Sequence, residues 1–356
     1  MRNMRRNLVF KAGPGAYDMI RGHGFSEEII GTILGASGGA KWLVLSQLDR
    51  VLLRRVLPKI PGSVHVLGSS IGAWRFACFA QKDPIAAIER FEAAYLEQTY
   101  TERPDAAEIS ARTAEILDTI LGSSGASDML AHPSIRTSIM TVRARHLVAS
   151  ESRAVLGAGL MLAMSANLVH RRALGAFFDR GLFYDAREVP PFFGMDDFPI
   201  HRVPLAASNV RDAIIASGAI PMVLQGVRDI PGAPRGMYRD GGVIDYHLDI
   251  QAAPAGRIAL FPHFFEWLKP GWFDRQLSWR RHRPSSIDRV VLVCPSPDFI
   301  ARLPDSKVPD RTDFERMPEF RRVRIWREVV NACIELAEEL NDVLDTGQLP
   351  ARLERL

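Results

Sequence analysis

Short apolar runs alternate along this chain with longer segments in which apolar residues recur every three or four positions. The run 29–35 is apolar and leads through a glycine-rich turn into 41–54, which has helical spacing. The apolar run 64–67 is followed in the same way by a helical segment over 73–80. Because parallel strands need a crossover between them, this alternation predicts a mainly parallel α/β sheet.

The pattern continues through the rest of the chain. The later expected elements are helices within 85–121, a strand over 135–144, a helix over 209–218, a strand over 288–295 and one long amphipathic helix over 319–344. We expect one α/β domain over residues 1–300. Residues 301–356 are expected to form a helical C-terminal extension packed on it.

Composition narrows the class of protein. The chain has 356 residues, of which 47% are hydrophobic and 24% charged, as in an ordinary globular protein. The net charge of +4 and the pI near 9.1 are mildly basic. This excess suits an anionic membrane surface, but it is too small to indicate a nucleic-acid partner.

Cysteine and histidine usage indicates reduced thiols and no metal. The three cysteines lie far apart in apolar surroundings, which predicts buried free thiols in a cytoplasmic protein rather than a disulfide framework. The nine histidines form no HExxH or HxH pair, and there is no CxxC. The N-terminal run Met1–Arg6 is basic, but no apolar core of a secretory signal follows it. We expect neither a metal nor a cofactor.

The most informative motif is Gly68-Ser69-Ser70-Ile71-Gly72, a GxSxG sequence between an expected strand and an expected helix. A sharp strand-to-helix turn leaves no room for side chains two positions on either side of the serine, so Gly68 and Gly72 are needed there. The turn would present Ser70 at the N-terminal end of a helix, where developing negative charge is favoured. This pattern predicts a nucleophile elbow with Ser70 as the nucleophile; the alternative is a plain βα turn.

A glycine-rich loop, residues 35–41, precedes the elbow by about 30 residues. Its consecutive glycines would let backbone N–H groups of the loop turn together toward an oxyanion. A phosphate-binding loop of the type GxxxxGK[ST] is the alternative. It requires Ser or Thr after the lysine, and here Trp42 follows Lys41.

A candidate base lies far downstream in Arg239-Asp240-Gly241-Gly242. A carboxylate on a Gly-Gly turn can approach a hydroxyl group closely. Asp-Gly is also a common signal for a β-hairpin turn, so the motif by itself leaves both interpretations of Asp240 open.

Together these motifs resemble the patatin-like phospholipase family. The order of a glycine-rich loop with a basic residue, GxSxG followed by Ala73, the segment Ala216–Pro221 and then Asp-Gly-Gly is typical of that family and covers about residues 28–250. The resemblance implies a three-layer α/β/α fold and a Ser–Asp dyad, with Ser70 as nucleophile and Asp240 as base. It also implies an oxyanion hole at Ser37, Gly38 and Gly39, and a lipid acyl ester, phospholipid or lysophospholipid, as substrate. The chain departs from the family pattern at Ser37 and Trp42, where the family has glycine.

Two other functions stay open at this stage. An α/β-hydrolase triad would need Asp240 or Asp245 followed by His247 or His263, although that fold usually has more strands before its nucleophile. A non-catalytic lipid-binding regulator could retain a hydrolase-like pocket. We otherwise expect His247 to be structural and His65 to be a satisfied core histidine.

Two segments could contact a lipid. Residues 154–169 carry no charge but fall short of the ~20 residues that span a bilayer, so a buried or interfacial helix is expected there. Residues 261–273 are aromatic and precede the basic run 280–283. Core packing is the alternative for both segments. The sequence leaves the lipid class and the oligomeric state undetermined.

Overall fold

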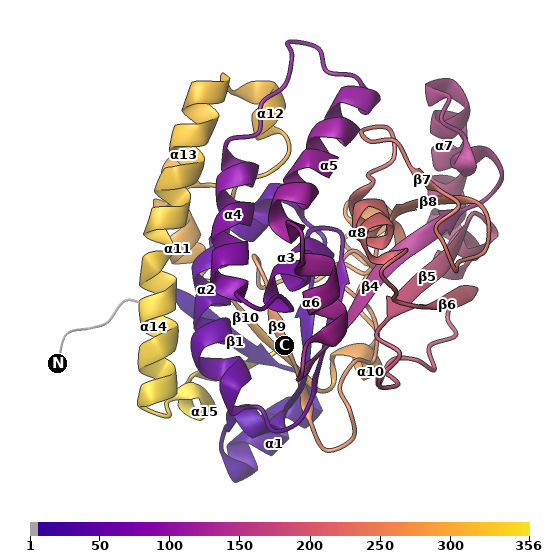
Figure 1. Ribbon diagram of the computed structural model, residues 1–356. Helices are drawn as coiled ribbons and strands as arrows, with labels where there is room; N and C mark the ends of the chain where they lie inside the picture. Colours follow the sequence, from indigo (N-terminus) through magenta and orange to yellow (C-terminus); the bar gives the residue numbers. More distant parts are fainter. Residues whose placement is uncertain (1–5) are drawn as a thin grey trace.

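The computed structural model describes residues 6–356, so residues 1–5 of the basic N-terminal run lie outside it. Its centre is an 11-stranded sheet, shown with its covering helices in Figure 1. The order along the main path is β11 (Leu353–Arg355), β1 (Leu8–Ala12), β10 (Val290–Pro295), β9 (Ile258–Pro262), β2 (Ile30–Gly35), β3 (Val64–Ser69), β4 (Ile135–Ala144), β5 (Phe178–Tyr184) and β6 (Ile200–Pro204). A side branch joins β8 (Met237–Asp240) to β4 and β7 (Val227–Arg228) to β8.

The central strands run parallel, as the alternating pattern predicts. The pairs β10–β9, β9–β2, β2–β3 and β3–β4 are all parallel, whereas β1–β10, β4–β5, β4–β8 and β7–β8 are antiparallel. Every residue of β2, β3, β9 and β10 is buried. A strand is buried along its whole length when helices cover both faces of its sheet, which makes this a three-layer α/β/α fold.

The helices on the N-terminal side include those expected over 41–54, over 73–80 and within 85–121, whereas the helices Pro14–His23 and Gly125–Ala131 were not expected. In Figure 1 several of them lie in front of the sheet. The α-helices before β5 are α1 (Pro14–His23), α2 (Ser46–Val51), α3 (Ile71–Phe79), α4 (Pro84–Leu96), α5 (Ala106–Leu121), α6 (Gly125–Ala131) and α7 (Arg153–Val169). The helix expected over 41–54 is continuous but mixed, because 3₁₀ turns over Gly39–Leu45 precede α2 and a π-helical stretch over Leu52–Val56 follows it.

The helices after β6 are shorter until the C-terminal segment. They are α8 (Val210–Gly218), α9 (Gly242–Asp245), α10 (Pro284–Ile287), α11 (Pro297–Arg302), α12 (Asp313–Arg316), α13 (Glu319–Ala332), α14 (Ile334–Asp345) and α15 (Leu349–Arg352). The prediction of a single long helix over 319–344 is wrong in one respect, since the segment divides into two helices, α13 and α14. The backbone tightens at Cys333 (φ −69°, ψ −6°), so α13 packs against α4 while α14 packs against α2 and β1.

The C-terminal segment also contributes a strand that the sequence pattern did not indicate. β11 pairs in parallel with β1, through partners such as Phe10 and Leu353. Strand β1 in turn lies antiparallel to β10. The two ends of the described chain therefore meet at one edge of the sheet.

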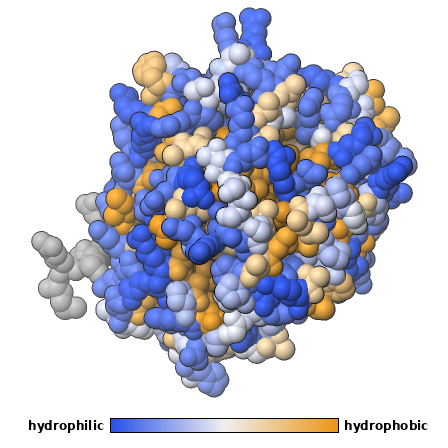
Figure 2. Space-filling model, viewed as in Figure 1, coloured by the Kyte–Doolittle hydropathy of each residue, from blue (hydrophilic) through white to orange (hydrophobic). Residues whose placement is uncertain are grey.

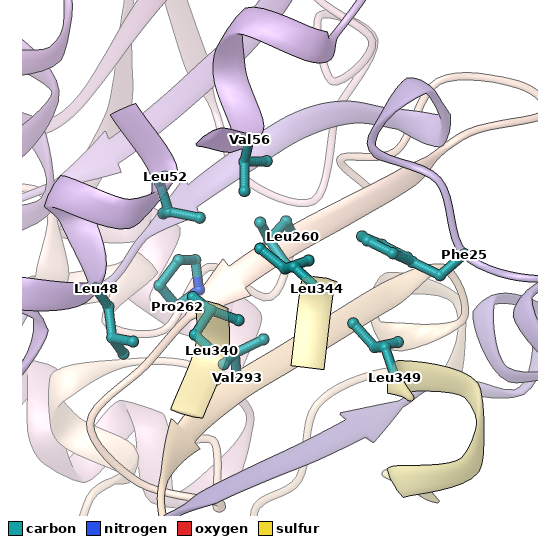
Figure 3. Close-up of a pocket in the computed structure, with 10 residues that line it drawn as sticks. All are labelled: Phe25, Leu48, Leu52, Val56, Leu260, Pro262, Val293, Leu340, Leu344 and Leu349. Atoms are coloured by element: carbon teal, nitrogen blue, oxygen red, sulfur yellow. The ribbon is translucent and has the colours of Figure 1, made fainter. Parts of the chain in front are cut away.

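A small apolar cavity lies within the core, between α2, α14 and the strands β9 and β10 (Figure 3). Its volume is about 20 Å³, and side chains such as Leu48, Leu260, Val293 and Leu340 line it. A void of this size is close to that of a single water, whereas ligand pockets enclose ~300 Å³ or more. Neither Ser70 nor Asp240 lines it. It is therefore a packing void and not a space for an acyl chain.

Candidate active site

Ser70 occupies a tight turn between β3 and α3. Its backbone is in a strained conformation with positive φ (φ 55°, ψ −125°), as in a nucleophile elbow. A Cβ on Gly68 would lie 2.4 Å from the Ala73 nitrogen, and one on Gly72 would lie 2.0 Å from the Gly35 oxygen. Both contacts are with backbone atoms, which cannot give way cheaply. The elbow is therefore built only with glycine at these two positions.

The Ser70 hydroxyl donates a hydrogen bond to Asp240 Oδ2 at 2.7 Å. Strand β4 is the template that brings the two residues together although 170 positions separate them in the sequence. Strand β5 pairs along one edge of β4. Along the other edge, Met140 pairs with Ser69 of β3 and the next residue, Thr141, pairs with Asp240 of β8. Adjacent residues of one strand therefore hold the two candidate catalytic side chains.

The Asp-Gly-Gly motif forms a strand-to-helix turn, so the hairpin interpretation is wrong. β8 ends at Asp240, and α9 begins at Gly242. A Cβ on Gly241 would lie 2.4 Å from the Met140 oxygen, and one on Gly242 would lie 2.4 Å from Ser37 Oγ. The two glycines let the carboxylate loop pack directly against β4 and the glycine-rich loop.

Burial controls the electrostatics of the pair. Ser70 is 5% exposed and Asp240 is 6% exposed. Burial raises the pKa of the Asp240 carboxyl from its ordinary 3.8 to about 7, while the hydrogen bonds from the Ser70 hydroxyl and the Gly242 N–H act in the opposite direction. The Gly242 N–H donates to Asp240 Oδ1 at 2.7 Å. A carboxyl group poised near neutral pH is suited to accept and return a proton.

The glycine-rich loop lies beside the pair, but one of its expected donors is already used. The Ser37 N–H donates to the Tyr246 carbonyl at 2.9 Å, so it does not serve an oxyanion in this structure. Within residues 6–356, the N–H groups of Gly38 and Gly39 have no protein acceptor. Gly39 has φ +56°, which favours glycine. Of the three N–H groups expected as oxyanion donors, those of Gly38 and Gly39 are therefore free of a protein acceptor within the described residues, and that of Ser37 is not.

Ser37 has a different part from the one expected of it. Its hydroxyl donates to Ser69 Oγ at 3.0 Å and touches the space that a Cβ on Gly242 would need. Trp42, the other departure from the family pattern, is fully buried and stacks on Phe91 with ring centroids 4.1 Å apart. These two residues fix the loop from within rather than face the reacting atoms.

The histidines proposed for a triad are engaged elsewhere. His247 Nδ1 accepts from the Lys269 N–H at 3.0 Å, and His263 Nδ1 lies 2.6 Å from the Phe265 carbonyl. Burial lowers the pKa of both imidazoles, that of His263 to about 3. No histidine of the described chain hydrogen-bonds Ser70 or Asp240. His65 is buried as expected, but it is not satisfied, because its Nδ1 has no partner among residues 6–356.

Ser217 lies in the segment Ala216–Pro221, but the sequence analysis gave this residue no role in the candidate site. Its hydroxyl accepts from the Ser70 N–H at 2.8 Å and donates to the Met140 carbonyl at 2.6 Å. The Ser217 carbonyl accepts from the Gly241 N–H at 3.3 Å. Ser217 therefore connects the elbow, β4 and the carboxylate loop. A serine in an otherwise apolar helix end before Pro221 was the available signal.

The two segments considered for lipid contact differ in exposure. Phe261, His263 and Phe264 are buried, so the lipid interpretation is wrong for them, and they pack in the core around β9. Trp267 and Trp272 of the same segment are 48% and 41% exposed. The uncharged stretch 154–169 forms α7, which is buried on one face and exposed on the other.

Comparison with known proteins adds fold-level similarities only. No family model and no curated protein matches the sequence. VipD from Legionella pneumophila matches at 12% identity and a TM-score of 0.33, over 76% of this chain and 56% of its own. Human GIVD cytosolic phospholipase A2 matches at 11% identity and a TM-score of 0.40, over 94% of this chain and 62% of its own. The chain thus spans less than two thirds of the length of each, and neither a family nor a substrate follows from similarities this low.

Proposed function

We propose that this chain is a metal-independent serine hydrolase of the patatin-like type that cleaves a lipid acyl ester, such as that of a phospholipid or lysophospholipid. The observation that carries the proposal is the 2.7 Å hydrogen bond from Ser70 Oγ to Asp240 Oδ2, at a strained turn next to a glycine-rich loop. The order of motifs along the sequence supports the same type of enzyme.

The chemistry needs a single base. Asp240 takes the proton of the Ser70 hydroxyl as Ser70 Oγ attacks the ester carbonyl, and the oxyanion is stabilised by the Gly38 and Gly39 N–H groups. The tetrahedral intermediate collapses, the ester C–O bond breaks, and Asp240 returns the proton to the leaving alkoxide. Water then attacks the acyl-enzyme, again with its proton passing to Asp240, and the fatty acid leaves as Ser70 regains its hydrogen.

Hydrolysis of a p-nitrophenyl acyl ester tests the proposal. We expect the purified protein to release p-nitrophenol in the presence of EDTA, and Ser70→Ala to lower kcat by at least ~10³-fold. If Ser70→Ala kept most of the activity, Ser70 would not be the nucleophile. A panel of lipids scored by released fatty acid then identifies the substrate class.

A second candidate is a non-catalytic lipid-binding regulator, and one observation favours it. The Ser37 N–H donates its hydrogen bond to the Tyr246 carbonyl, so fewer N–H groups are left for an oxyanion than the glycine-rich motif predicts. A serine-directed fluorophosphonate probe separates the two functions. Labelling that Ser70→Ala abolishes supports the hydrolase, whereas a folded protein that binds lipid vesicles but takes no label supports the regulator.

A further inference from the structure

Helix α7 carries apolar residues on its exposed face as well as on its buried face. Its inner face is buried through Leu156, Gly159, Ala163 and Asn167, which recur at three- and four-residue steps. The outer face carries exposed Val155, Met161, Leu162, Met164, Leu168 and Val169, with exposures from 37% to 88%. A helix that meets water normally turns a charged face outward, and α7 carries no charge from 154 to 169. Its outer face is therefore suited to contact an apolar environment rather than water.

Three neighbouring side chains extend this apolar face. Leu147, 43% exposed, lies where a Cβ on Gly159 of α7 would meet it. Trp272 is 41% exposed on a short helix over Trp272–Asp274 that contacts α7. Trp279 is 65% exposed, and the next residue, Arg280, donates to the Asn167 carbonyl of α7 at 2.7 Å. We call the exposed side of α7 with Leu147, Trp272 and Trp279 the α7 surface.

Cations rim the α7 surface. Arg153 begins the helix, Arg172 follows its end and Arg281 follows the Trp279 loop, and all three side chains are exposed. Within residues 6–356 none of the three forms an ion pair. The nearby carboxylates are taken, since Asp274 pairs with Arg171 and Arg280, and Glu151 pairs with Arg239. The rim therefore presents positive charge without a compensating acid.

We infer that the α7 surface docks this protein on the headgroup region of a bilayer that contains anionic phospholipid. Exposed aliphatic side chains on one helix face, tryptophans at their edge and arginines around them match the layers of such a surface, with acyl chains inside and anionic headgroups outside. A docking surface for a second protein would more often contain carboxylates or a shaped groove. The unpaired arginines fit a diffuse negative surface instead. Among residues 6–356, none of the helices is long and apolar enough to cross a membrane.

The position of α7 in the fold suits this docking. In Figure 1 it stands at the outer edge of the molecule, on the side away from α13 and α14. Figure 2, drawn from the same side, shows apolar patches interrupting a largely hydrophilic face. Beneath the helix, Leu156 and Ala163 share a buried cluster with Val243 and Ile244 of α9, the helix that follows Asp240. The α7 surface thus lies over the element that follows the candidate base.

Vesicle co-sedimentation tests the inference with the full chain carrying Ser70→Ala, so that binding is read without any lipid turnover. We expect binding to vesicles of phosphatidylcholine and phosphatidylserine at 7:3, and much weaker binding to phosphatidylcholine alone or in 0.5 M salt. Leu162→Asp with Leu168→Asp should lower the partition coefficient by at least about tenfold, since two apolar side chains lose their insertion. Arg172→Glu with Arg281→Glu should remove the preference for phosphatidylserine.

Phe320→Asp with Ile334→Asp is the matched control, because these side chains are 76% and 46% exposed on α13 and α14. This control should bind vesicles as the parent does. Thermal melts establish that each variant folds, and quenching of Trp272 and Trp279 by brominated lipid reports insertion directly.

The inference is overturned if the parent fails to bind anionic vesicles. It is equally overturned if the α7 variant binds them as well as the control. A dimer that the α7 substitutions dissociate, with no vesicle binding, would show that a second copy of the chain covers this surface. None of these results depends on esterase activity, so the docking and the proposed function can fail separately.

Discussion

Ser217 Oγ accepts a hydrogen bond at 2.8 Å from the backbone N–H of Ser70, a residue 147 positions earlier in the chain. The same hydroxyl donates to the Met140 carbonyl at 2.6 Å. The strained backbone of the candidate nucleophile is thus held by a side chain from α8, and the hydroxyl that holds it is fully buried. A buried N–H without this acceptor would cost ~1–3 kcal/mol.

Ser217→Ala tests this positioning. We expect kcat to fall by about tenfold or more, because the Ser70 N–H loses its acceptor and the elbow can relax. The value of KM and the apparent pKa of the pH profile should stay unchanged, which a general loss of fold would not produce. Ser123→Ala, at an exposed position in the turn after α5, is the matched control and should leave kcat intact. A folded Ser217→Ala protein with full kcat would contradict the assignment.

The pH profile of the esterase should report Asp240. The base must be ionised, and burial raises the pKa of its carboxyl to about 7. We therefore expect kcat/KM to rise with pH up to about 7 and to level off above it, measured with p-nitrophenyl esters. A profile that is flat from pH 5 to 8 would contradict Asp240 as the base.

The same pKa has a consequence for stability. The folded state holds the Asp240 proton up to about pH 7, whereas the unfolded chain releases it near 3.8. Between these values the native state binds more protons, so this group contributes less stability as pH rises. Asp240→Asn removes that titration while keeping an acceptor for the Gly242 N–H.

We expect Asp240→Asn to be as inactive as Ser70→Ala, yet to melt a few degrees higher than the parent at pH 8. At pH 4 the two melting temperatures should converge. Asp196→Asn replaces an exposed aspartate and should change neither activity nor melting temperature. A lower melting temperature for Asp240→Asn at pH 8 would mean that the carboxylate stabilises the fold.

Gly72→Ala tests the close packing at the elbow. Its Cβ would lie 2.0 Å from the Gly35 carbonyl oxygen, so β2 and α3 must move apart. We expect a loss of ~3 kcal/mol or more in unfolding free energy, measured by urea denaturation, together with loss of esterase activity. Gly22→Ala in α1 meets open space, and it should be neutral or stabilising by up to about 1 kcal/mol. Equal stability of the two variants would contradict the packing at the elbow.

His247→Ala and His263→Ala distinguish a dyad from a triad. Both imidazoles bond backbone groups away from Ser70, so turnover per active site titrated with fluorophosphonate should fall less than about fivefold. Their burial means that stability falls, which is why the rate is scored per titrated site. A loss as large as that of Ser70→Ala would show that one histidine is the base.

Local sequence was sufficient for much of the architecture. The apolar runs predicted β2, β3 and β10, because a buried parallel strand needs a continuous apolar stretch, and an alternating, β-branched pattern predicted β4. Short strands escaped prediction, such as β11 at the edge of the sheet and β8 between β4 and β7, since three or four residues with mixed polarity acquire strand geometry only by pairing with a neighbour. The break between α13 and α14 was missed for a similar reason, as the helical spacing continues through Cys333 and packing against separate partners divides the helix.

For the candidate site, the sequence by itself determined the two glycines around Ser70 and the residue types that could carry the chemistry, because steric limits at a tight turn are local. Tertiary structure alone decided that Asp240 Oδ2 lies 2.7 Å from Ser70 Oγ, because β3 and β8 both pair with β4 in a fixed register. It also decided that the Ser37 N–H donates to the Tyr246 carbonyl, and that burial raises the pKa of Asp240 to about 7. Distances across 170 positions and the loss of water around a carboxylate depend on how the chain packs, so no local pattern can encode them.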